Sequence, residues 1–189
     1  SEWGPWIESH SDTLRRMAAA YDFQAQNGRL LVVPATDGSI ERVVFGAGDT
    51  ANAQVVGALA QNLPAGEYRI VFAPKEFTPT AMAIAWGLRA YGFDRYKKRK
   101  RPAPLLAPPE HADMEDARRV VAASWLARDL VNTPTNDMGP EALQAAAQAV
   151  ADAHGARLDA IVGEALLEQN YPLIHAVGRA AAEAPRLLH

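Results

Sequence analysis

The chain has 189 residues, of which 49% are apolar and 22% charged, and its formal net charge is −3. The apolar content is sufficient for a hydrophobic core and argues against intrinsic disorder, while the acidic balance argues against a general nucleic-acid or membrane-surface protein. The absence of cysteine excludes disulfides and thiolate metal sites. Apolar runs are far shorter than a membrane span and residues 1–5 lack a signal-peptide pattern, so we expect a cytoplasmic protein.

The first hundred residues alternate short segments typical of strands with segments typical of helices. Residues 30–33 are predicted to form a strand, and residues 42–45 its partner across the turn at Asp37-Gly38. Because Asp-Gly is the strongest hairpin signal in the chain, these two strands are expected to be antiparallel neighbours.

A helix, a strand and another helix are predicted next. Residues 51–63 are expected to form the helix, which ends before Pro64, and residues 68–72 the strand. Thr78 is predicted to cap the following helix, with Pro79 at its first position. The apolar residues of that helix recur at a spacing of four: Met82, Trp86 and Ala90. This alternation predicts a small α/β domain with a mixed sheet.

A break in the pattern follows. The basic run Lys97-Lys98-Arg99-Lys100-Arg101 precedes prolines at positions 102, 104, 108 and 109. Each proline removes a backbone donor and fixes φ, so this stretch cannot continue a helix or a central strand. We therefore predict a linker here, with an N-terminal α/β domain at residues 1–108 and the incomplete opening segment of a larger α/β domain at residues 109–189.

A long helix opens the second part. Residues 113–131 carry two adjacent apolar lines, which predicts burial on more than one side. The two lines are Met114, Ala117, Val121 and Trp125, and Val120, Ala123, Ala127 and Leu130.

A second helix is predicted to begin at Pro140 and to end at Gly155, a residue suited to a left-handed cap. Its inner face is predicted to carry Leu143, Ala146 and Val150. Residues 157–162 are predicted as a strand, and residues 186–189 as the start of another.

Three ordered segments share a resemblance to one family. They are Arg128-Asp129-Leu130-Val131-Asn132-Thr133-Pro134-Thr135-Asn136-Asp137-Met138-Gly139-Pro140-Glu141, the aromatic segment at residues 85–96, and residues 171–187 with a V-G…P-R-L pattern. Together they resemble the leucyl aminopeptidases, the dinuclear-metal M17 family. The chain departs from the family at Ala181 or Ala182, where a serine is common, and its first eighty residues match only loosely.

The resemblance implies an exopeptidase that releases N-terminal residues from peptides and assembles as a hexamer. It implies two divalent cations, Mn or Zn, held by a lysine, three aspartates and a glutamate, which polarise the scissile carbonyl and activate a water. Those ligands lie in a G-K-G…D segment and an N-T-D-A-E-G-R segment, and neither occurs here. We therefore predict no catalytic, cofactor-binding or metal-binding residue in residues 1–189, and no activity of this chain alone.

The runner-up hypothesis is a non-catalytic α/β module that binds a nucleotide or nucleic acid. Residues 43–51 follow a strand, G-x-G-x-x-A, helix pattern, but the predicted hairpin makes that strand antiparallel, unlike the first strand of a dinucleotide-binding fold. The basic run from Lys97 to Arg101 could contact phosphates, and some leucyl aminopeptidases also bind DNA. A charge run in a linker is more often only solvated, so nucleic acid is not expected as a partner, and the run's partner, if any, stays open.

The predicted incompleteness has a physical consequence. The strand at residues 186–189 would have a free edge, and the apolar faces around Trp125 and Val150 would lack partners. We expect either a companion chain that covers these surfaces or self-association of the fragment.

Overall fold

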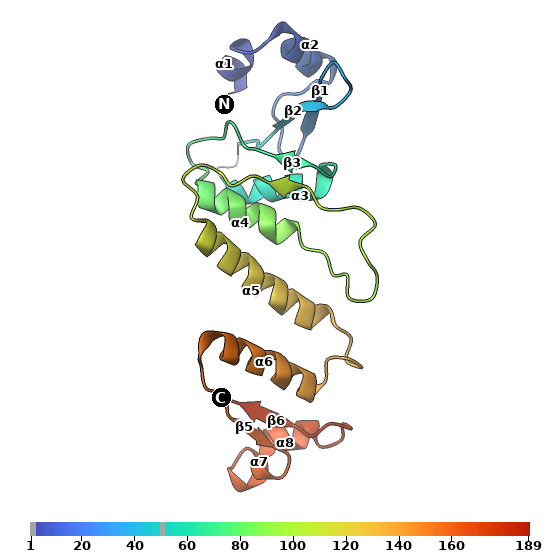
Figure 1. Ribbon diagram of the computed structural model, residues 1–189, viewed down its shortest axis with the longest axis vertical. Helices are drawn as coiled ribbons and strands as arrows, with labels where there is room; N and C mark the ends of the chain where they lie inside the picture. The colour runs from blue at the N-terminus through green and yellow to red at the C-terminus, as the bar shows by residue number, and fades with distance from the viewer. Residues whose placement is uncertain (1–2, 50–51) are drawn as a thin grey trace. The chain divides into compact units, whose positions relative to one another are not determined.

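The computed structural model describes residues 3–49 and 52–189, which form two compact units, Ser1–Trp125 and Leu126–His189 (Figure 1). In the first unit the elements are α1 (Trp3–Glu8), α2 (Asp12–Ala20), β1 (Leu30–Pro34), β2 (Ile40–Phe45), the 3-10 helix η1 (Ala53–Val56), α3 (Gly57–Asn62), β3 (Glu67–Tyr68), α4 (Pro79–Arg89), β4 (Leu105–Leu106) and the first part of α5 (Met114–Asn132). The second unit contains the end of α5, then α6 (Pro140–His154), β5 (Ala160–Val162), α7 (Ala165–Glu168), α8 (Pro172–Gly178) and β6 (Arg186–Leu188). No helix in the described ranges is long and apolar enough to cross a membrane.

The predicted hairpin is confirmed. Strands β1 and β2 pair antiparallel, with Leu30 opposite Phe45, and the register shifts after Val33. In the turn, the Asp37 carboxylate accepts hydrogen bonds from the Ser39 hydroxyl at 2.7 Å and from the Ser39 backbone N–H at 2.9 Å. These bonds favour the ionised form and lower the pKa of Asp37. The first core cluster, with Phe23 at 1% exposure in its centre, lies between this hairpin and the N-terminal helices.

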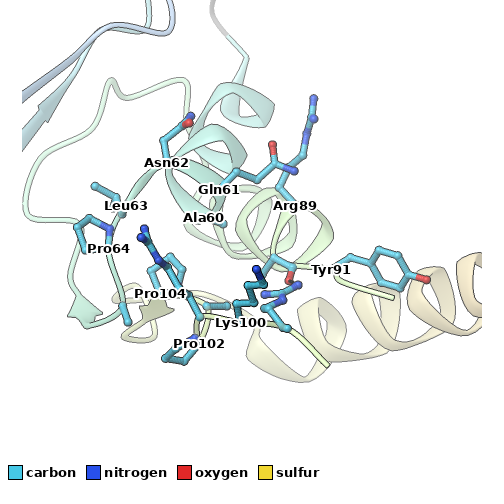
Figure 2. Close-up of a pocket in the computed structure, with 15 residues that line it drawn as sticks. Ala60, Gln61, Asn62, Leu63, Pro64, Arg89, Tyr91, Lys100, Pro102 and Pro104 are labelled. Atoms are coloured by element: carbon cyan, nitrogen blue, oxygen red, sulfur yellow. Dashed lines mark hydrogen bonds between the residues drawn. The ribbon is translucent and has the colours of Figure 1, made fainter. Parts of the chain in front are cut away.

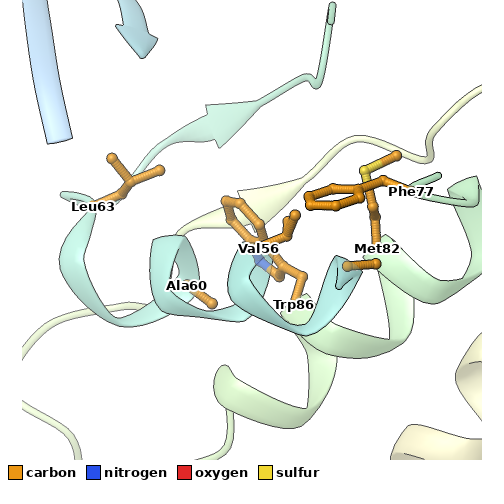
Figure 3. Close-up of a cluster of buried hydrophobic side chains, with 7 residues drawn as sticks. Val56, Ala60, Leu63, Phe77, Met82 and Trp86 are labelled. Carbon is orange, nitrogen blue, oxygen red and sulfur yellow. The ribbon is translucent and has the colours of Figure 1, made fainter. Parts of the chain in front are cut away.

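The predicted α4 is confirmed from its first turn onward. The Thr78 hydroxyl accepts from the Ala81 backbone N–H at 3.4 Å, and Pro79 is the first helical residue. Met82 and Trp86 are buried in a second core cluster against η1 and α3, which Figure 3 shows. The other buried members of this cluster are Ala53, Val56, Ala60, Leu63 and Phe77.

The helix predicted at residues 51–63 is present in two pieces, η1 and α3, and ends before Pro64 as predicted. Its expected first residue, Ala51, lies outside the described residues.

The strand predicted at residues 68–72 is wrong beyond its first residue. Strand β3 is only Glu67–Tyr68, and its parallel partner is Leu105–Leu106. That partner is flanked by prolines at positions 104, 108 and 109, which have no N–H to donate, so the ladder ends after the Ala107 N–H bonds to the Tyr68 carbonyl at 2.8 Å. The parallel and antiparallel pairs found in the described ranges form separate two-stranded sheets instead of one mixed sheet.

The proline-rich segment predicted as a linker is part of the compact first unit. It contributes β4, and the Trp86 indole N–H donates to the carbonyl of Pro104 at 3.3 Å. The compact first unit continues to Trp125, inside α5. The domain boundary that we place between residues 108 and 109 remains a prediction.

In the second unit the predicted ends of α6 are confirmed, with Pro140 at its start and Gly155 in the left-handed region at a φ of 63°. Strands β5 and β6 pair antiparallel, with Ile161 opposite Leu187. In the described part of the chain β5 and β6 form a two-stranded sheet. Leu166 of α7 is completely buried.

The predicted burial of α5 on more than one side is wrong, and the predicted inner face of α6 is exposed within its unit. In α5 only Ala117 is buried, although burial on more than one side was expected. In α6 the expected inner residues Leu143 and Val150 are 47% and 42% exposed, while Ala151 is buried. The apolar periodicity of α6 identified a face that needs a partner. Within this unit, however, α6 contacts β6 through the polar side chains of Glu141 and Gln144. The exposure expected around Trp125 and Val150 is present.

Candidate functional site

The signature at residues 128–141 covers the end of α5, the connection to α6 and the first two residues of α6. Thr133 is buried, and both its backbone N–H and its hydroxyl donate to the carbonyl of Asp129, at 3.0 and 2.6 Å. The next residue is Pro134, which has no N–H to continue the helix, while its carbonyl accepts from Asp137 and Met138, both at 2.9 Å. The Asn-Thr-Pro sequence therefore ends α5, and a hydrogen-bonded turn at residues 134–138 follows.

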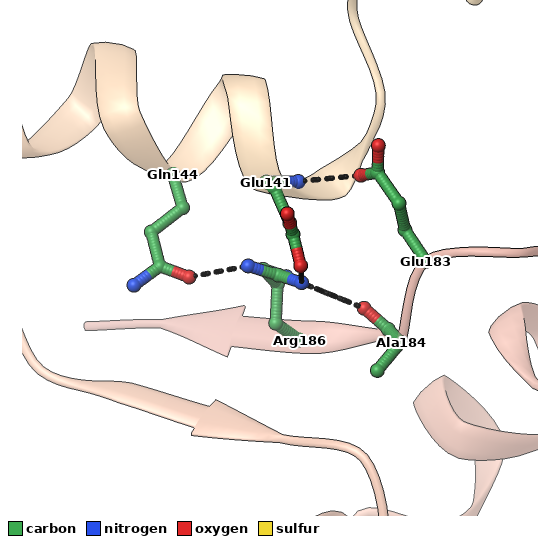
Figure 4. A network of polar contacts seen from close by, with 5 residues as sticks. All are labelled: Glu141, Gln144, Glu183, Ala184 and Arg186. Carbon is green, nitrogen blue, oxygen red and sulfur yellow. Dashed lines mark hydrogen bonds and ion pairs between the residues drawn. The ribbon is translucent and has the colours of Figure 1, made fainter.

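The start of α6 is capped from a distance. Its N-cap residue, Gly139, has no side chain to accept a bond, and the Glu183 carboxylate instead accepts from the Glu141 backbone N–H at 2.8 Å (Figure 4). A Cβ at position 139 would lie 2.5 Å from that carboxylate, so glycine permits the approach. The negative carboxylate at this helix N-terminus is also favoured by the helix dipole.

Arg186 joins the same network from β6. Its guanidinium donates to the Gln144 side-chain oxygen at 2.7 Å, forms an ion pair with Glu141 at 3.3 Å, and donates to the carbonyl of Ala184 (Figure 4). The Arg186 side chain is only 10% exposed. The signature and the P-R-L segment, about forty residues apart in the chain, thus meet in one polar network, which we call the Arg186 network: Glu141, Gln144, Glu183, Ala184 and Arg186.

Sequence reasoning assigned no role to Glu183, Gln144 or Arg186. One signal was available, because a helix that begins Gly-Pro has no side chain at its N-cap and needs an acceptor from elsewhere.

The aromatic segment at residues 85–96 lies in the first unit. The Trp125 indole N–H donates to the carbonyl of Gly87 at 3.0 Å, and the rings of Trp125 and Tyr91 lie 6.0 Å apart. Phe93 and Tyr96 form another edge-to-face pair, with ring centroids 5.8 Å apart. The Trp125 bond joins α5 to α4, and the ring contacts account for the aromatic pattern by packing.

The G-x-G turn does not have the geometry of a phosphate-binding loop. The Gly46 N–H donates to the carbonyl of Arg29 at 2.8 Å, and the Gly48 N–H to that of Ala25 at 3.0 Å. A Cβ on Gly46 would overlap the carbonyl of Gln26. The preceding strand is antiparallel to its neighbour, as predicted. Both N–H groups are engaged within the chain, and the last positions of the pattern, residues 50–51, lie outside the described residues.

The residues present do not fit a dinuclear metal centre. Within residues 3–49 and 52–189, no three or more His, Asp or Glu side chains gather in a way that could hold a metal ion. Two histidines have short polar contacts: His175 lies 3.0 Å from a single carboxylate, that of Glu164, and His10 lies 2.7 Å from the carbonyl of Trp6. We assign no catalytic step to any residue of this chain, and the prediction that it contains no catalytic or metal ligand stays a prediction.

Comparison with known families agrees with the resemblance that residues 85–96, 128–141 and 171–187 indicate. Residues 1–109 match the model for the M17 aminopeptidase N-terminal domain, and residues 125–189 match that for the catalytic domain of the cytosol aminopeptidase family. The chain belongs to the M17 aminopeptidase family. The resemblance stated from the sequence and the α/β fold class are thereby confirmed.

Individual relatives of this M17 chain agree with its family membership. A probable cytosol aminopeptidase from Streptomyces avermitilis is 37% identical over 153 residues, which cover 71% of the chain and 30% of the relative. The crystal structure of cytosol aminopeptidase from Coxiella burnetii superposes with a TM-score of 0.87 at 29% identity, covering 99% of the chain and 41% of that protein. The bottromycin maturation enzyme BotP, solved in complex with Mn, gives a TM-score of 0.72 at 28% identity, over 90% of the chain and 40% of BotP.

The M17 chain therefore spans 30% of the S. avermitilis relative and 41% of the C. burnetii structure. These comparisons give no support to the alternative of a nucleic-acid-binding module.

Proposed function

We propose that this chain is the N-terminal domain, residues 1–108, and the opening segment of the catalytic domain, residues 109–189, of a metallo-aminopeptidase. The complete enzyme would release N-terminal amino acids from peptides. The observation that carries the proposal is the superposition on the C. burnetii cytosol aminopeptidase over 99% of the chain.

The proposed enzyme uses two divalent metal ions, Mn or Zn, which polarise the scissile carbonyl and activate a water when bound. The manganese complex of BotP supports a metal of this kind. Because the described residues offer no fitting ligand set, the proposal places the ligands in a part of the enzyme outside residues 1–189.

This chain's own residues have a structural part in the proposed enzyme. The Arg186 network fixes the first turn of α6 against β6. Assembly as a homo-hexamer and a cytoplasmic location, both expected from the family resemblance, complete the proposal; the S. avermitilis relative, a probable cytosol aminopeptidase, supports the location.

The test begins with the intact mass of the protein from its native host, under denaturing conditions. We expect a species much heavier than the 20.4 kDa of this chain, with hydrolysis of leucine amide that a chelator abolishes and Mn²⁺ or Zn²⁺ restores. Purified residues 1–189 are expected to show no metal-dependent hydrolysis. A host species of 20.4 kDa that lacks peptidase activity would overturn the proposal.

A further inference from the structure

A pocket of about 600 Å³ lies in the first unit, apart from the Arg186 network (Figure 2). It is formed by the end of α3, the end of α4 and the segment at residues 99–104. Pro64, Pro102 and Pro104 provide rigid apolar walls. Its size lies in the range of about 300–1,000 Å³ that is usual for small-molecule sites.

The charge of this pocket has one sign. Arg89, Arg99, Lys100 and Arg101 line it, and no aspartate or glutamate does. In the part of the chain that the structure describes, no carboxylate lies within ion-pair distance of these four cations. Four uncompensated positive charges on a chain of net charge −3 create a local field that attracts anions.

Part of the pocket is held in place before any ligand binds. The Arg99 guanidinium donates to the carbonyl of Ala90 at 2.9 Å, which fixes it across the end of α4. The bond from the Trp86 indole to the carbonyl of Pro104 anchors the other end of the loop. Gln61, Asn62 and Tyr91 add neutral polar groups to the lining.

Helix capping accounts for only two of the cations. Arg89 is in the last turn of α4 and Arg99 bonds to its C-cap, where positive charge is favoured by the helix dipole. Lys100 and Arg101 lie on the loop and make no such bond, yet they line the same pocket. Their placement needs an explanation beyond the end of the helix.

We propose that this pocket binds a small polyvalent anion that carries phosphate groups, such as a free polyphosphate or a nucleoside triphosphate. Guanidinium groups recognise phosphate oxygens with paired hydrogen bonds, and lysine adds a point charge. The neutral polar lining and the proline walls leave room for an uncharged part of the ligand. The inference does not rest on the proposed peptidase activity.

The test is isothermal titration of the 189-residue chain with sodium triphosphate and, separately, with ATP, both free of magnesium. Saturable binding of one ligand per chain is expected. The double variant Lys100→Ser, Arg101→Ser should weaken it about tenfold or more, because two charge-assisted contacts are lost. The control Lys75→Ser, Lys97→Ser removes the same charge from exposed lysines that do not line the pocket, and should change affinity less than about twofold. Circular dichroism of each variant checks that the fold is retained.

Equal affinities for triphosphate and ATP would support a site for the phosphate groups alone, and tighter binding of ATP would support a nucleotide as the ligand. If both double variants lost affinity for the probes to the same extent, the proposal would be overturned, because the binding would then reflect the overall positive charge and not this pocket. The absence of saturable binding of either probe would also overturn the proposal. So would a DNA oligonucleotide that binds far more tightly than ATP and depends on Lys100 and Arg101.

Discussion

The two units of this chain are stabilised in different ways. The first contains two clusters of buried apolar side chains, around Phe23 and around Trp86. In the second, few apolar residues are buried (Ala151, Ile161 and Leu166), and the Arg186 network joins α6 to β6. Apolar burial contributes in proportion to area, whereas a polar network depends on each partner being present. Single substitutions should therefore act on the two units by different mechanisms.

The largest effect is expected from Trp86→Ala. Its side chain is 4% exposed and lies in the centre of the second cluster, so removal should cost about 3–5 kcal/mol of unfolding free energy. Urea denaturation followed by circular dichroism measures this. The control is Trp125→Ala, at a residue 37% exposed, which should cost clearly less. Equal costs would mean that the cluster around Trp86 is not a centre of stability.

The Arg186 network is tested by Arg186→Met, which keeps an unbranched apolar stem and removes the guanidinium donors. Gln144 and the carbonyl of Ala184 lose their partner, and a cost of about 1–3 kcal/mol is expected. Hydrogen exchange should show faster opening of α6 and β6 with no change around Trp86. Arg157→Met is the matched control, because that arginine is 85% exposed, and it should leave exchange in α6 unaltered. Equal loss of protection around Trp86 and in α6 would contradict a stabilising role of the network confined to the second unit.

A smaller effect is expected at the cap of α6. Glu183→Ala removes the acceptor for the Glu141 N–H and should cost about 1 kcal/mol. Glu183→Gln keeps an acceptor without the charge and should recover most of that loss. Faster exchange confined to the first turn of α6 is the expected signature. If alanine and glutamine behave identically, the hydrogen bond is not the stabilising feature.

The smallest effect concerns pH and the hairpin of the first unit. The Ser39 bonds lower the pKa of Asp37, so this carboxylate stabilises the folded state above the ordinary aspartate pKa of about 3.9, and the contribution is lost as the pH falls through the lowered value. Ser39→Ala should raise the pKa of Asp37, measured by NMR titration of its carboxyl carbon. Ser39→Thr, which retains the hydroxyl, should leave it low. A titration unchanged in Ser39→Ala would refute this account of the turn.

Local signals predicted the local structure well. The Asp-Gly turn, the Thr78-Pro79 start of α4 and the Pro140 and Gly155 ends of α6 each depend on a few neighbouring residues, and each is confirmed. The strand at residues 68–72 was wrong because its length is set by a partner more than thirty residues away. The predicted inner face of α6 is exposed within its unit, because periodicity shows which side of a helix is apolar and does not show what that side contacts.

The same limit applies to the candidate site. The family resemblance located the signature, but the partners of its residues were not predictable from spacing. Glu183 caps a helix that begins 43 residues before it, and Arg186 reaches Gln144 only because β6 passes beside α6. The roles of these side chains are properties of the fold, and the pattern of residues alone does not contain them.

The proline-bounded strand β4 has one further consequence. Its backbone is extended for only two residues, and prolines at positions 104, 108 and 109 deprive its surroundings of N–H donors. A foreign strand approaching this edge would find too few hydrogen-bonding groups to add to the sheet. The prolines that end the ladder with β3 therefore also protect the domain against amyloid-like growth from that edge.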